Sequence, residues 1–162
     1  MIRSYMKFNS SFVVIPLITI SILSIGGLLT RNPDTWIWYR SLVLPELTPP
    51  SWVFPLAWNI IFVLTTIAGI LVWNSFERTT TFWLIIGLFF ANAFLNILWS
   101  FLFFRQHLIG TALIDAISLE VVTIALAVLI AIKSLAIASL LLPYVIWVAF
   151  AIYLNFLILQ LN

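Results

Sequence analysis

The chain has 162 residues, of which 64% are hydrophobic and only 7% charged, and its mean hydropathy is +1.22. Soluble domains carry roughly a quarter charged residues, so this composition excludes an ordinary soluble protein and indicates a chain whose solvent is lipid. The net charge of +2 comes from scattered Lys and Arg, which excludes a nucleic-acid-binding surface, and the absence of cysteine excludes disulfides and thiolate chemistry.

Charged residues divide the sequence into five apolar runs. The first covers residues 8–29 and is too long for the apolar segment of a cleaved signal peptide. Each run has about 22 to 26 residues, which suits a tilted helix that crosses a hydrocarbon core about 30 Å thick. The sequence therefore predicts an all-α, multi-pass integral membrane protein, with one domain over residues 1–162 and a bundle of five transmembrane helices. The other four helices are expected at residues 54–76, 82–104, 108–132 and 136–161.

The stretch from residue 31 to residue 52 differs from the apolar runs on either side of it. It holds four charges, four prolines and three tryptophans. This composition predicts a structured, Pro- and Trp-rich loop at the membrane surface between the first and second helices. Four of the Lys and Arg residues are expected on the N-terminal side of the membrane and three on the opposite side. This small difference leaves the orientation open, and the sequence does not identify the membrane.

Asn92, Asn96 and Trp99 lie in the third predicted helix at spacings of four and three, which places them on one face. An amide in hydrocarbon is costly unless it finds a partner. One interpretation is that both asparagines bond to neighbouring helices, each contributing about 0.6–2 kcal/mol. The other is that they line a cavity.

Asp115 and Glu120 lie five residues apart in the fourth helix, so they project about 140° from each other and do not form a paired-carboxylate site. Glu120 is expected near the bilayer centre, where a carboxylate is a functional candidate. The alternatives to a functional role for Glu120 are a protonated side chain, or a bond to Asn92, Asn96 or Asn155 on another helix. For Asp115 we favour a structural role.

His107 is the only histidine, and it follows Arg105 at a helix end. One histidine and two separated acids predict no metal site, and axial haem ligation by His107 has no second ligand to support it. Eight tryptophans are more unusual. An interfacial belt explains those near the ends of spans, but it explains Trp58, Trp99 and Trp147 less well. Aromatic faces gathered inside a bundle suit a flat, apolar ligand.

Three blocks of sequence carry unusual residues at fixed spacings. The first comprises Trp38-Tyr39, Leu42, Pro45, Pro49-Pro50, Trp52, Phe54 and Trp58. The second combines Asn92, Asn96 and Trp99 with Phe103-Phe104-Arg105-Gln106 and with Ala112-Leu113-x-Asp115. The third is Pro143-Tyr144-x-x-Trp147-x-x-Phe150-Ala151 with Leu154-Asn155. Together they resemble the tryptophan-rich sensory protein family, TspO, whose animal members are translocator or peripheral-type benzodiazepine receptor proteins, over nearly the whole chain.

The resemblance implies a five-helix bundle, commonly a homodimer, with an intramembrane pocket beneath the first loop. In the family this pocket binds porphyrins such as protoporphyrin IX and other flat hydrophobic molecules, as ligands rather than as a required cofactor. The implied partners are thus such a ligand, the lipid bilayer and a second copy of the chain, without nucleic acid. The matching ligand-binding positions are Trp38, Tyr39, Trp52, Phe54, Trp58, Asn92, Asn96, Trp99, Trp147 and Ala151.

Three functions follow from the resemblance and stay open. The first is a membrane receptor or sensor for porphyrins. The second is an enzyme that degrades porphyrin in light and oxygen, with Trp58 and Trp147 in the catalytic positions. The third is a transporter of porphyrin or another apolar molecule, for which Glu120 is a candidate proton-linked residue.

The chain also departs from the family pattern. Leu44 and Leu47 stand where the family often has Lys and Trp, which leaves Arg40 as the loop cation for ligand carboxylates. No basic residue follows Tyr153, so the cholesterol motif of the animal members is not predicted. The resemblance does not explain Glu120.

Overall fold

The computed structural model describes residues 10–162, and this part of the chain is helical without any strand. Within residues 10–162, five helical segments are long and apolar enough to cross a membrane, which confirms the multi-pass bundle. Their bounds are Ser11–Thr30, Val53–Ser75, Thr80–Arg105, Ile109–Ala131 and Leu135–Leu161. The predicted spans agree with these within a few residues at each end. The predicted start of the first span at residue 8 lies outside the described residues.

The region predicted as a loop contains a helix, α2 (Pro33–Ser41). Asn32 caps it, because its side chain accepts a hydrogen bond from the backbone N–H of Asp34 at 3.1 Å. Pro33 occupies the first turn, where a missing N–H costs nothing, and Asp34 carries negative charge at the positive end of the helix. The structured loop predicted over residues 31–52 therefore includes a short helix, α2, which was not predicted from the sequence.

The predicted last span, residues 136–161, is two helices rather than one. A short helix, α6 (Leu135–Ser139), is followed by a break and then by α7 (Leu142–Leu161). Pro143 explains the break, because it lacks the N–H that would continue the hydrogen-bond ladder and its ring would clash with the carbonyl one turn earlier. It is tolerated in the first turn of α7.

The third span also changes its geometry near its end. Helix α4 (Thr80–Ser100) continues into a π-helical turn, η1 (Phe101–Arg105), and the Gln106 N–H bonds to the Phe101 carbonyl at 3.0 Å. His107 then adopts a φ of 57°, in the left-handed region. These two features reverse the chain within a few residues, and α5 (Ile109–Ala131) runs back beside α4.

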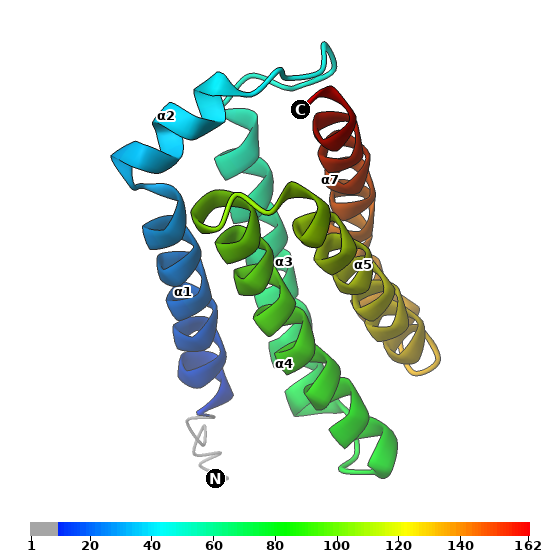
Figure 1. Cartoon of the computed structure of the whole chain (residues 1–162). Helices are drawn as coiled ribbons and strands as arrows, with labels where there is room; N and C mark the ends of the chain where they lie inside the picture. Colours follow the sequence, from blue (N-terminus) through cyan, green and yellow to red (C-terminus); the bar gives the residue numbers. More distant parts are fainter. Residues whose placement is uncertain (1–9) are drawn as a thin grey trace, which may run out of the picture.

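The remaining helices are α1 (Ser11–Thr30) and α3 (Val53–Ser75). Figure 1 shows α2 and the loop after it crossing the end of the bundle where the C-terminus lies. This cover is fixed at two points. The Thr35 hydroxyl donates to the Phe104 carbonyl at 3.1 Å, and the Asn162 side chain bonds to both the N–H and the carbonyl of Val43, at 3.0 and 3.2 Å.

Candidate ligand site

Tyr144 is the centre of a buried hydrogen-bond network that joins three helices. Its hydroxyl donates to Asn92 Oδ1 at 3.0 Å and accepts from Asn96 Nδ2 at 3.1 Å. Asn92 Nδ2 also donates to Thr123 Oγ1 on α5 at 2.9 Å. Asn92 and Asn96 reach one hydroxyl because they lie one turn apart on α4. The network therefore links α4, α5 and α7 through bonds that hydrocarbon cannot replace.

Aromatic side chains from α3 and α7 pack beside this network. The Trp58 and Tyr144 rings lie 6.0 Å apart at 80°, and the Phe54 and Trp147 rings lie 5.8 Å apart at 74°. Phe54 and Trp58 are one turn apart on α3, so they share a face. We call this group the mid-bundle aromatic cluster; it comprises Phe54, Trp58, Tyr144 and Trp147, and its two tryptophans pack against buried Ile61, Leu119 and Val148.

A second group, the sub-loop aromatic cluster, lies between α2 and η1 and comprises Trp38, Tyr39, Trp99, Phe103 and His107. Trp38 stacks on His107 with ring centres 4.0 Å apart, and Trp99 stacks on Phe103 at 5.1 Å. Phe103 is buried and also contacts the rings of Trp38 and Tyr39, at 5.4 and 6.5 Å. Burial raises the pKa of the Tyr39 phenol above its usual value of 10.0. Stacking on Trp38 gives His107 a packing role.

Trp99 belongs to the sub-loop cluster although it shares a helix face with the two asparagines. Its indole Nε1 donates to Asn155 Oδ1 at 3.1 Å, and Asn155 Nδ2 donates to the Ile109 carbonyl at 3.0 Å. These bonds tie α4, α7 and the start of α5 together. Most of the ligand-binding positions implied by the family resemblance are thus divided between two clusters.

Two implied positions join neither cluster through a ring contact or side-chain hydrogen bond within residues 10–162. Trp52 precedes α3 and is 63% exposed. Ala151 is half-buried on α7, one turn after Trp147. The structure therefore brings together Phe54, Trp58, Asn92, Asn96 and Trp147, and it leaves Trp52 on the surface.

The two acids of α5 find no partner among the asparagines. Asp115 is buried, and neither its Oδ2 nor Glu120 Oε2 has a hydrogen-bond partner in the described part of the chain. Glu120 lies midway along α5, as predicted. Of the alternatives for Glu120, a bond to Asn92, Asn96 or Asn155 is not formed in the described residues, because those amides bond to the groups named above.

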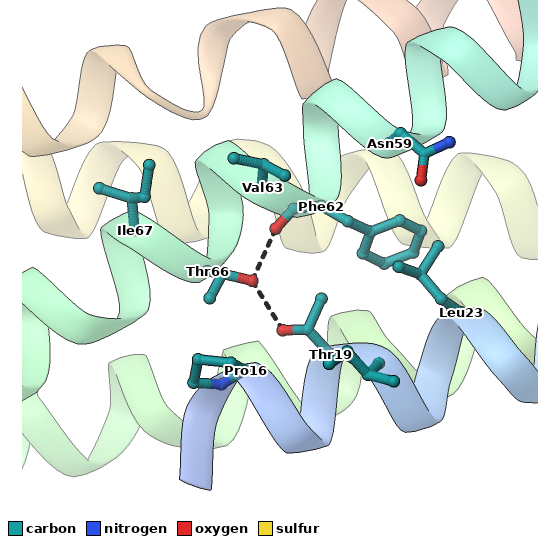
Figure 2. Close-up of a pocket in the computed structure, with 9 residues that line it drawn as sticks. Pro16, Thr19, Leu23, Asn59, Phe62, Val63, Thr66 and Ile67 are labelled. Atoms are coloured by element: carbon teal, nitrogen blue, oxygen red, sulfur yellow. Dashed lines mark hydrogen bonds between the residues drawn. The ribbon is translucent and has the colours of Figure 1, made fainter. Parts of the chain in front are cut away.

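A separate groove of about 240 Å³ lies between α1 and α3 (Figure 2). Its lining is mostly apolar, and Thr19 and Thr66 share a hydrogen bond of 2.8 Å across it. The Phe62 ring reaches from this groove to the Trp58 ring, 5.6 Å away. None of the implied ligand positions lines the groove. Within residues 10–162 there is no cluster of three or more His, Asp or Glu side chains that could hold a metal ion.

Sequence reasoning missed Tyr144 and Thr123 as site residues. Tyr144 stands three residues before Trp147, so both lie on one face of α7, and that spacing together with a phenol in an apolar run was the available signal. Thr123 gave a weaker signal, because a threonine in a transmembrane helix often bonds only to its own backbone. Its bond to Asn92 depends on how α4 and α5 pack.

Comparison with known proteins gives consistent matches over most of the chain. The model of the TspO/MBR family matches residues 12–161. The tryptophan-rich protein TspO of Chlorobaculum tepidum is 36% identical over 141 residues, which cover 85% of this chain and 86% of that protein. The TspO of Archaeoglobus fulgidus is 36% identical over 146 residues, with 88% and 93% covered. The human translocator protein is 31% identical over 120 residues, with 74% and 71% covered.

Proposed function

The chain belongs to the TspO/MBR family, and on this premise we propose that it is a membrane receptor or sensor for porphyrins. Its ligands would be protoporphyrin IX and similar flat hydrophobic molecules, bound against the mid-bundle aromatic cluster. Such a ligand presents a large π-surface to aromatic side chains and a few polar atoms to fixed donors. The mid-bundle aromatic cluster offers the aromatic surface, and the Trp147 indole within it offers a donor.

The observation that carries the proposal is the Trp147 side chain. Its indole Nε1 is buried and has no hydrogen-bond partner among residues 10–162, while its ring packs against Phe54 and Phe150. Buried polar atoms without a partner are rare in native proteins, and each calls for an explanation. A ligand oxygen or nitrogen that accepts this N–H would supply one.

The test is a titration of the detergent-purified chain with protoporphyrin IX in the dark, with the dissociation constant taken from porphyrin absorbance. Trp147→Phe keeps an aromatic ring but removes the donor, so we expect affinity to fall about five- to tenfold, as for one lost hydrogen bond. Trp83→Phe is the matched control, because Trp83 is 56% exposed and packs with Trp73 and Phe82 instead. Equal affinities in the two variants would remove Trp147 from the site, and no saturable binding would remove porphyrin as the ligand.

The packing of Trp58 and Trp147 into one cluster also favours a second candidate, light-dependent porphyrin degradation. Indole is electron-rich, and a tryptophan next to a photoexcited porphyrin would act as the electron donor, with molecular oxygen as the oxidant. The same titrated samples, illuminated in air, test this. Steady loss of the porphyrin spectrum that Trp58→Phe and Trp147→Phe both abolish would make the chain an enzyme. A stable spectrum would leave it a binding protein.

A further inference from the structure

A second cleft, of about 480 Å³, lies at the end of the bundle away from α2. Its walls come from the α3–α4 connection, the start of α4 and the α5–α6 connection, which Figure 1 places at the end opposite the C-terminus. Four spans begin or end here, so the cleft lies at the depth of the lipid headgroups. Its volume falls within the range of ligand-binding sites. None of the ligand positions discussed above lines it.

The lining changes from apolar to polar along the cleft. Phe82 and Ile85 are buried side chains of α4 and form its apolar part. Glu77 and Lys133 are exposed and supply one negative and one positive charge. A molecule that fits this arrangement is an amphiphile with an apolar end and a head that carries both charges.

Two hydroxyl groups complete the polar part. Thr79 Oγ1 accepts the N–H of Phe82 at 3.4 Å, and Ser134 Oγ accepts the N–H of Ile137 at 3.3 Å. Each caps a helix as an acceptor, so its own O–H stays available as a donor. Together with the Lys133 ammonium they give the cleft a set of donors suited to phosphate oxygens.

Within the described residues, the Glu77 carboxylate and the Lys133 ammonium do not form an ion pair with each other. No ion pair within 4.0 Å joins Lys133 or Glu77 to another charged side chain in the described residues. Arg78 does not line the cleft, but its guanidinium lies 4.2 Å from the ring centres of both Trp73 and Phe82, and Phe82 belongs to the cleft wall. The charged side chains that line the cleft itself are one cation, Lys133, and one anion, Glu77, and this pairing favours a zwitterionic head over an anionic one.

We propose that this cleft binds the headgroup of a phospholipid whose head pairs a phosphate with a primary ammonium, that is, a phosphatidylethanolamine. The phosphate contacts Lys133 and the hydroxyls of Thr79 and Ser134, and the ammonium donates to Glu77. The start of an acyl chain packs against Phe82 and Ile85. A bound lipid would then bridge the α3–α4 and α5–α6 connections and hold this end of the bundle together.

Native mass spectrometry of the full chain in mild detergent tests the proposal. Phosphatidylethanolamine, phosphatidylcholine and phosphatidylglycerol with identical acyl chains are the probes. We expect the chain to retain one phosphatidylethanolamine in preference to the other two. Lys133→Gln should weaken its binding about tenfold, since a charge-assisted bond to phosphate is lost. Glu77→Gln should abolish the preference for phosphatidylethanolamine over phosphatidylglycerol.

Glu46→Gln and Arg105→Gln are the matched controls, because both side chains are exposed and lie outside the cleft. Equal retention of all three lipids, or equal weakening in the control variants, would mean annular lipid only and overturn the proposal. A wild-type preference for phosphatidylglycerol would overturn the zwitterionic assignment. Unchanged circular dichroism spectra and thermal unfolding of Lys133→Gln and Glu77→Gln would show that both variants are folded. Failure of porphyrin to bind the wild type would refute the proposed function without touching this inference.

Discussion

Removal of the Tyr144 hydroxyl is the sharpest test of the hydrogen-bond network. Tyr144→Phe keeps the ring that packs against Trp58 but leaves Asn92 Oδ1 and Asn96 Nδ2 without their bonds of 3.0 and 3.1 Å to that hydroxyl. Side-chain hydrogen bonds between transmembrane helices average about 0.6 kcal/mol and reach about 1.7. Two such bonds make the expected loss of unfolding free energy about 1–3 kcal/mol.

The assay is reversible unfolding in mixed detergent micelles, followed by circular dichroism. Tyr153→Phe is the matched control, because Tyr153 lies on the same helix, is 49% exposed and makes no side-chain hydrogen bond within residues 10–162. It should change stability by less than about 0.5 kcal/mol. If both variants lose the same amount, the network contributes nothing specific and the reasoning fails.

A double-mutant cycle separates this network from simple loss of a polar group. Asn96→Leu alone removes the amide that donates to Tyr144 and should destabilise the chain. In Tyr144→Phe with Asn96→Leu, two partners are lost together, and the cost should be less than the sum of the single losses by about 0.5 kcal/mol or more. Strict additivity would show that the two side chains do not interact.

Three further predictions concern the end of the bundle beneath α2. Trp99→Phe removes the indole donor to Asn155 and should lower the unfolding free energy by about 1 kcal/mol, measured in the same micelles. Thr35→Val removes the bond to the Phe104 carbonyl, and hydrogen exchange should speed up across α2 while the spans keep their protection. Asn162→Ala removes both bonds to Val43 and should speed exchange at that residue, with α2 unaffected. Uniform exchange across the chain would contradict the last two.

The five spans were predictable because lipid demands long uncharged helices, so the charges alone marked most boundaries. The exceptions depend on local chemistry that hydropathy does not register. Helix α2 has an apolar content too low for a span, and its signal was the sequence Asn32-Pro33-Asp34, a cap followed by a proline in the first turn. The break before α7 was likewise marked by Pro143 inside an otherwise continuous apolar run.

The candidate site was predictable only in part. Helical spacing placed Asn92 and Asn96 on one face, and the structure shows them in hydrogen bonds to neighbouring helices, the first of the two interpretations. Which groups they would meet depended on how α4, α5 and α7 pack, and no local pattern contains that information. Trp99 lies on the same helix face as the two asparagines, as predicted, but it bonds to Asn155 and belongs to the sub-loop aromatic cluster. Helical spacing alone could not predict that partner either.

The buried polar atoms that lack a partner point to one side chain more strongly than to the others. Among such atoms in the spans are Asp115 Oδ2, Glu120 Oε2 and Trp147 Nε1, which have no hydrogen-bond partner within residues 10–162. The surrounding hydrocarbon offers them no partner either. A buried carboxyl group can reduce its cost by taking up a proton and becoming neutral. An indole is a donor only and has no such alternative. In this conformation Trp147 Nε1 lacks an acceptor among the described residues, so under the proposed function its replacement is the one that reports most directly on ligand binding.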